Sequence, residues 1–195
     1  MKLYRTLFIV LVFILILSAC ASAQTRVVNT PQPVATTAPT IVTTAAATPE
    51  WFSMPMTDVQ TGKTFTMNDY AGKVVLLETI AMWCPTCLLQ SGQVQKLHRV
   101  LGNPEDLISV TLDVDSNENE AALKDYASTY GMDWHFAVAP LLVERALGNL
   151  YSAEYLNPPL SPMLIIDREG NVHQLAYGLK QVAELQKLVE PYLTK

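Results

Sequence analysis

Apolar positions follow two different spacings between residues 51 and 195. Short, continuous apolar runs typical of buried strands alternate with longer segments in which apolar residues recur every three or four positions, as on one helix face. Strands are predicted at 73–81, 107–114, 134–139, 163–166 and 172–177, and helices at 84–101, 117–130, 140–152 and 180–193. This order predicts an α/β domain with helices covering a central sheet. Two short segments, 51–56 and 64–67, flank Thr61-Gly62-Lys63 and predict an N-terminal β-hairpin.

Local signals place the ends of two of these helices. Pro85 suits the first turn of its helix, where a missing N–H costs nothing, and Gly102 suits the end. Asn117, followed three residues later by Glu120, resembles a capping box that starts the next helix. Asp113 and Asp115, between a strand and that helix, are also most simply explained as capping residues.

The N-terminus has the pattern of an export signal. Lys2 and Arg5 precede an apolar run of 11 residues, Leu7–Leu17, which is shorter than the roughly 17–25 residues of a membrane-spanning helix. The following Leu-Ser-Ala-Cys resembles the lipobox of bacterial lipoproteins, which implies cleavage of residues 1–19 and lipidation of Cys20. An uncleaved anchor with an incidental thiol at Cys20 is the alternative, and both place the domain outside the cytoplasm.

Residues 20–50 are rich in Thr, Ala and Pro and have almost no charge or large aromatic residue. Such a segment buries too little apolar surface to offset its ordering entropy, so it is predicted to be a disordered tether to a domain at 51–195. Removing residues 1–19 leaves 11 basic and 18 acidic residues, a net charge of −7. This acidic balance argues against nucleic acid as a partner.

The candidate chemistry lies in Trp83-Cys84-Pro85-Thr86-Cys87, directly after the predicted strand 73–81. Two thiols three residues apart at a helix start share one face and can bridge, and the helix N-terminus favours the thiolate of the first. Cys84 is therefore the expected nucleophile. A permanent disulfide or half of a metal site is the alternative.

A metal site is disfavoured because zinc needs four ligands and the chain offers no further free cysteine near this pair. His98, His135 and His173 are scattered along the chain. His98 is expected to be solvated, and the other two to be structural. No metal is predicted.

The order of elements resembles the thioredoxin fold over nearly all of 51–195, with a central mixed β-sheet flanked by helices. More narrowly, the motifs at 61–63, 70–77, 83–87 and 165–170 resemble those of the membrane-tethered, TlpA/ResA-type thiol-disulfide oxidoreductases. The resemblance implies that Cys84 attacks a substrate disulfide and that Cys87 resolves the mixed disulfide. It implies no cofactor beyond this redox-active pair.

The resemblance also implies a proton relay. Glu78 lies on an otherwise apolar strand six residues before Cys84, where thioredoxins place an acid beneath the disulfide that serves the resolving Cys87. A more open strand end with a solvated Glu78 is the alternative. The family's second acid falls at Gln90, which can hydrogen-bond but cannot titrate.

Further residues are implied to contact the substrate. Trp83 would shield the sulfurs and offer a flat contact surface, with an ordinary core role as its alternative. Pro85 and Thr86, between the cysteines, would line the site and tune the thiolate. Pro162 is the candidate for a cis-proline facing the disulfide, with Pro159 second and an all-trans loop as the alternative, and Ser161 would pair with the substrate backbone.

These features predict a lipid-anchored, extracytoplasmic, monomeric thiol-disulfide oxidoreductase that exchanges disulfides with exported proteins. A reducing role is expected, for example toward apocytochrome c, fed where one exists by a membrane electron donor. The alternative is copper delivery, because 112–115, 126–127 and 131–134 also resemble the Sco-type proteins, although Leu160-Ser161 stands where those have a histidine. A peroxiredoxin is disfavoured by Ala81 and Leu77, where that family has Thr and Pro.

Overall fold

The computed structural model describes residues 48–193. The predicted signal peptide, the lipidation candidate Cys20 and nearly all of the predicted tether lie outside these residues. Within them, a five-stranded sheet has the order β5-β4-β3-β6-β7. Its strands are β3 (Val74–Ile80), β4 (Leu107–Asp113), β5 (His135–Val138), β6 (Met163–Ile166) and β7 (Val172–Gln174).

The sheet is mixed, as the sequence predicts. Strand β3 pairs in parallel with β4 and antiparallel with β6, β4 pairs in parallel with β5, and β6 pairs antiparallel with β7. Glu78 on β3 stands opposite Thr111 of β4 on one side and Met163 of β6 on the other. The central strand β3 is therefore hydrogen-bonded to a neighbouring strand on each side, and Glu78 lies in the middle of the sheet.

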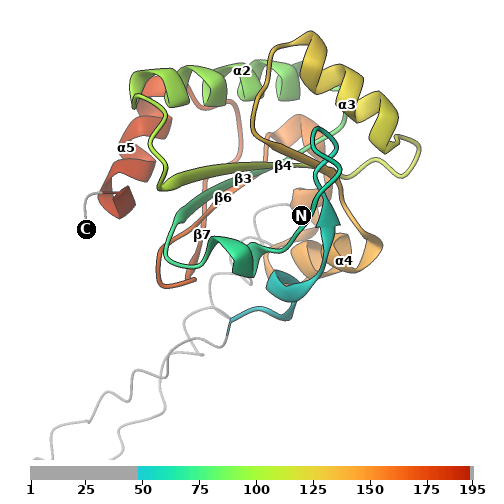
Figure 1. Ribbon diagram of the computed structural model, residues 1–195, viewed down its shortest axis with the longest axis horizontal. Helices are drawn as coiled ribbons and strands as arrows, with labels where there is room; N and C mark the ends of the chain where they lie inside the picture. The colour runs from blue at the N-terminus through green and yellow to red at the C-terminus, as the bar shows by residue number, and fades with distance from the viewer. Residues whose placement is uncertain (1–47, 194–195) are drawn as a thin grey trace, which may run out of the picture. The chain divides into compact units, whose positions relative to one another are not determined.

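Helices cover both faces of this sheet (Figure 1). They are α2 (Pro85–Val100), α3 (Glu120–Thr129), α4 (Leu141–Leu150) and α5 (Val182–Leu193). Alternate residues of β3 point to opposite faces. Val74, Leu76 and Ile80 pack in one core cluster with α2, α3 and α5, whereas Val75 and Leu77 pack in a second cluster with α4. Glu78 has the parity of Leu76, so its side chain enters the layer beneath α2.

The two strands of the N-terminal hairpin are shorter than the sequence predicts. Strands β1 (Met56–Thr57) and β2 (Thr64–Phe65) pair antiparallel, but residues 50–53 form the 3-10 turn η1 (Glu50–Ser53). Trp51 in this turn is fully buried, and its indole N–H donates to the Tyr151 hydroxyl at 3.0 Å. This buried anchor holds the segment against the domain, so residues 51–53 do not extend the strand. A second 3-10 turn, η2 (Met67–Tyr70), leads into β3.

One expectation about a helix start is wrong. Helix α3 is capped by Asn119, whose side chain accepts the Ala122 N–H at 3.1 Å, and not by Asn117. The Asn117 amide instead donates to the Asp115 carboxylate at 2.9 Å, which keeps it in the preceding turn. Helix α5 matches the last predicted helix to within two residues. No helix within residues 48–193 has both the length and the apolarity needed to cross a membrane.

Candidate active site

Cys84 and Cys87 form a disulfide at the start of α2, with their Cα atoms 5.3 Å apart. Strand β3 ends at Ile80, and a short loop brings Cys84 to the N-cap of the helix. The Cys84 sulfur accepts the backbone N–H of Cys87 at 3.2 Å, one of the amides that a helix start leaves unpaired. This position stabilises a thiolate at Cys84 once the bond is reduced. Pro85 occupies the first helical turn, as predicted.

Cys87 lies against a proline-rich loop. Its sulfur is 3.4 Å from the carbonyl oxygen of Pro158, which can accept a hydrogen bond from the thiol in the reduced protein. Pro158 belongs to the 3-10 turn η4 (Pro158–Leu160), which follows another, η3 (Ala153–Leu156). Both cysteines are only 1% exposed, so an exchanging partner must contact the loops around the pair.

Glu78 is buried beneath this helix turn, with 3% of its surface exposed. Its Oε1 accepts hydrogen bonds from the hydroxyls of Ser91 on α2 and Thr111 on β4, each at 2.8 Å. Ser91 is four residues after Cys87 and therefore one turn further along the same helix face. Glu78 is thus held on the side of α2 that carries Cys87, and the alternative of a solvated carboxylate is wrong.

Burial raises the pKa of Glu78 to about 7, even though the Ser91 and Thr111 hydroxyls and the charge of Lys180 each lower it. Its second oxygen, Oε2, has no hydrogen-bond partner among residues 48–193. A carboxyl that titrates near neutral pH and keeps one oxygen free is suited to accepting and returning a proton.

Lys180 was not singled out by the sequence analysis. It is 2% exposed and lies in the loop between β7 and α5. Its ammonium donates to the Gly178 carbonyl at 2.8 Å and lies 3.4 Å from the Ser161 carbonyl. A lone lysine at the start of a predicted helix carries no signal of burial, because lysines there are normally solvated.

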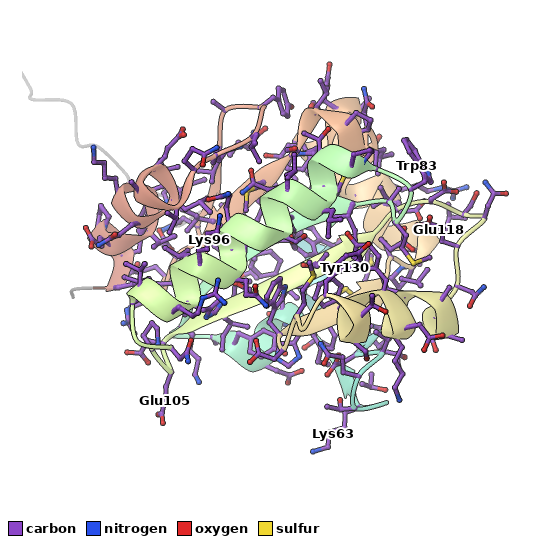
Figure 2. The ribbon with its side chains drawn as sticks, turned by 90° about the horizontal axis from the view of Figure 1, so that it is seen from above. Lys63, Trp83, Lys96, Glu105, Glu118 and Tyr130 are labelled. Atoms are coloured by element: carbon purple, nitrogen blue, oxygen red, sulfur yellow. A yellow bond between two sulfur atoms is a disulfide. The ribbon has the colours of Figure 1, made fainter. Side chains whose placement is uncertain are left out.

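Trp83 lies beyond the N-terminal end of α2, with Glu118 beside it (Figure 2). It is 59% exposed, so the core alternative is wrong. The indole N–H donates to Asp115 at 2.6 Å, and Glu118 accepts the Met82 N–H at 2.7 Å. The acidic turn after β4 therefore holds the loop that precedes Cys84.

Asp113 does not cap a helix, contrary to expectation. It is fully buried, and burial first, then the neighbouring Glu118 and Asp115, raise its pKa to about 8. One of its oxygens accepts the Asp115 N–H at 3.0 Å. Burial and the neighbouring acids therefore favour the protonated form of this carboxyl, in the same turn that contacts Trp83.

The expected cis-proline is absent. Every peptide bond within residues 48–193 is trans, including the bonds before Pro159 and Pro162. Ser161 instead adopts a left-handed backbone conformation, with φ of 47°, after its N–H closes the η4 turn onto Pro158 at 2.8 Å. This reversal directs the chain into β6, and the contact with Cys87 comes from Pro158. Ser161 is 2% exposed.

The three histidines stand apart from the disulfide pair. His98 is half-buried and not solvated as expected, because its Nε2 lies 2.7 Å from the Ser109 hydroxyl and its ring stacks on Trp134. His173 contacts Asp167 at 2.8 Å, and His135 lies 3.5 Å from Asp58. Residues 48–193 contain no group of three or more His, Cys, Asp or Glu side chains placed to hold a metal ion.

A mixed five-stranded sheet whose central strand leads into a helix-capping Cys-Pro-Thr-Cys disulfide defines a thioredoxin-like thiol-disulfide oxidoreductase. The model of the Redoxin family matches residues 33–189. The chain therefore belongs to the Redoxin family.

Individual relatives are distant. The thioredoxin-like protein YneN of Bacillus subtilis is 22% identical over 66% of this chain and 71% of its own length. A thiol:disulfide interchange protein of Chlorobium tepidum superposes with a TM-score of 0.57 at 20% identity, covering 71% of this chain and 94% of that one. BsSco, a member of the Sco family of cytochrome c oxidase assembly proteins, gives 0.57 at 19% identity, covering 72% and 91%. At these identities the likeness concerns the fold.

Proposed function

We propose that the protein reduces disulfides in exported proteins from a lipid-anchored position outside the cytoplasm. The observation that carries the chemistry is the juxtaposition of a helix-capping Cys84 with a buried Glu78 on the side of α2 that carries Cys87. The first provides a stabilised nucleophile, and the second provides a proton acceptor at neutral pH.

In the proposed cycle, the reduced Cys84 thiolate attacks one sulfur of a substrate disulfide. A Cys84–substrate disulfide forms, and the other substrate sulfur leaves as a thiolate. The Cys87 thiol then gives its proton to Glu78 and attacks the Cys84 sulfur, which releases the second substrate thiolate and forms the Cys84–Cys87 disulfide. Two electrons pass from the enzyme dithiol to the substrate, and a membrane electron donor would restore the dithiol.

Two exposed groups beside the pair suit a polypeptide substrate. Trp83 offers a large aromatic surface, and the neighbouring Pro85 is also exposed. Thr86 is half-buried on the helix turn between the sulfurs. Ser161 and Pro162, expected to pair with a substrate strand, are buried, and the Ser161 N–H and carbonyl already bond Pro158 and Lys180. Substrate contact is therefore proposed for Trp83, Pro85 and Thr86.

The proposed location rests on the sequence before the domain. Lys2, Arg5, the apolar run 7–17 and the lipobox-like 17–20 support export and lipidation at Cys20. In an oxidising compartment, dedicated reductants keep particular cysteines reduced, and apocytochrome c before haem attachment is such a substrate. Incorporation of radiolabelled palmitate that disappears in Cys20→Ser would support the anchor, and equal labelling of the variant would contradict it.

The direction of electron flow is tested by the reduction potential of the Cys84–Cys87 pair. The chain from residue 20 with Cys20→Ser is equilibrated with glutathione or dithiothreitol, and the dithiol fraction is read by thiol alkylation. A value near or below roughly −270 mV supports a reductant. A value toward roughly −120 mV marks a disulfide donor and overturns the proposed direction.

Copper delivery is the second candidate, favoured by the Sco-like segments at 112–115, 126–127 and 131–134 and by the likeness to BsSco. Two thiolates can bind soft Cu(I), but no histidine stands at residues 160–161. Tight Cu(I) binding by the reduced protein, lost in Cys84→Ser, together with failure to reduce an insulin disulfide, would establish copper delivery instead.

A further inference from the structure

The burial of Lys180 needs an explanation beyond folding. The side chain is buried, and a buried ammonium loses hydration, which destabilises the folded protein unless the charge is paired. Long cationic side chains therefore normally extend to solvent. Burial lowers the pKa of Lys180, whereas the carboxylates of Glu184 and Glu78 oppose that shift. An apolar residue at this position would fill the space without that cost.

The position of Lys180 is fixed from helix α2. The Gln90 side chain accepts the Lys180 backbone N–H at 2.7 Å and donates to the Lys180 carbonyl at 3.3 Å. Gln90 is 1% exposed and lies three residues after Cys87 on the same helix face. The residue at the family's second acid position therefore holds the loop that carries Lys180.

The Lys180 ammonium bonds the carbonyls of its own loop. It donates to the Gly178 carbonyl and approaches that of Ser161, a non-glycine residue in the left-handed conformation. Helix α2 links this loop to Glu78, because Gln90 bonds Lys180 and the next residue, Ser91, bonds the Glu78 carboxyl. The charges of Glu78 and, from the first turn of α5, Glu184 raise the pKa of Lys180.

The other groups packed around Glu78 carry no positive charge. They are the hydroxyls of Ser91 from α2 and Thr111 from β4, and Met163 opposite it on β6. The charge of Glu78 also contributes to the raised pKa of Tyr126 on α3, which is neutral or negative and not cationic. Among the described residues, Lys180 is the cation whose charge acts on Glu78.

We propose that Lys180 is a positioning residue of the exchange site, which fixes the Ser161 turn and balances the charge of Glu78 while that carboxylate awaits the Cys87 proton. The inference rests on the proposed proton-accepting role of Glu78. Lys180 exchanges no proton in this scheme and contacts neither sulfur.

The test compares Lys180→Met and Lys180→Gln with wild type and with Lys187→Met, which removes an exposed lysine of α5. The Glu78 titration is followed in the oxidised protein by the infrared carbonyl band of its protonated carboxyl, identified by loss of the band in Glu78→Gln. Loss of the Lys180 charge should raise the Glu78 pKa by about one pH unit, a tenfold change in its acid dissociation constant. Lys187→Met should leave it unchanged.

The pH profile of insulin-disulfide reduction gives a second readout. With Lys180→Gln, which keeps a hydrogen-bond donor without the charge, the rate should fall severalfold at pH 7 and recover at higher pH. In a Glu78→Gln background the same change should no longer shift the profile. An unshifted Glu78 band and profile in both Lys180 variants would overturn the inference.

Failure of the proposed function has a different signature. In that case Glu78→Gln itself would leave the pH profile of wild type unchanged, or the cysteine pair would not cycle at all. If Lys180→Met does not fold, Lys180→Gln carries the comparison alone, because its amide can still donate to the Gly178 carbonyl.

Discussion

Replacing Glu78 by Gln should remove a pH-dependent cost to stability. The glutamine Oε1 can accept the same hydrogen bonds from Ser91 and Thr111. Its amide nitrogen takes the place of Oε2, which has no hydrogen-bond partner within residues 48–193. That unpaired nitrogen costs some stability, but the cost is the same at every pH. The substitution therefore isolates the ionisation of the carboxyl.

The magnitude follows from the raised pKa of Glu78. In the unfolded chain the carboxyl titrates near 4.5, and in the folded protein near 7. Between these values the folded state binds the extra proton, so stability falls as the pH rises and is level again above the folded pKa. A difference of about 2.5 pH units corresponds to about 3 kcal/mol. Below pH 4.5 this cost is absent.

The assay is urea unfolding of the oxidised protein at pH 4, 6 and 8. The free energy of unfolding of Glu78→Gln minus that of wild type should rise by about 3 kcal/mol from pH 4 to pH 8. Titration of other groups cancels in this difference. Glu120→Gln, a change of an exposed acid in the first turn of α3, is the matched control and should show no such rise. A difference that stays constant across the three pH values would refute the assignment of a buried Glu78 with a raised pKa.

Two other substitutions probe the surroundings of the site, and a third probes the opposite end of β3. Ser91→Ala removes a hydroxyl that lowers the pKa of Glu78, so the infrared titration of that carboxyl should move above about 7. Trp83→Phe deletes the indole bond to Asp115, and because this bond is solvent-exposed, urea unfolding should show only a small loss of stability. Arg168→Lys loses the guanidinium contacts to three backbone carbonyls and one carboxylate, and thermal unfolding should report a loss of about 2 kcal/mol.

The fold could be predicted from the sequence because its signals are local and repeated. The apolar runs at 73–81 and 107–114 match the strands β3 and β4, and the apolar stripe after Cys84 matches α2. The Cys84–Cys87 pairing also follows from spacing alone, since residues three apart at a helix start share one face. These features require only short-range physical rules.

The rest of the site depends on contacts between distant segments. Lys180 is buried because Gln90 bonds its backbone across 90 positions of sequence, and no local pattern encodes such a pair. Asp113 occupies a position typical of a capping residue, but Glu118 and Asp115 fold back beside it. The loop before β6 combines a trans bond at Pro162 with a left-handed Ser161, whereas the sequence marks only the prolines.

The sheet face beneath α2 carries buried polar groups whose presence the packing of the core does not explain. Along β3 and β4, Glu78, Ser109, Thr111 and Asp113 place buried polar groups in the same layer as the apolar Leu76 and Ile80, and two of them are carboxyls with raised pKa values. Apolar residues of similar size would make that layer more stable, because buried carboxyls lose hydration that the protein only partly replaces. Both carboxyls, and therefore the loss of stability that they cause, lie toward the strand ends that lead to the disulfide loop and the acidic turn. A proton acceptor that works near neutral pH must be buried to have a raised pKa, so the stability lost at Glu78 follows directly from the chemistry proposed for Cys87.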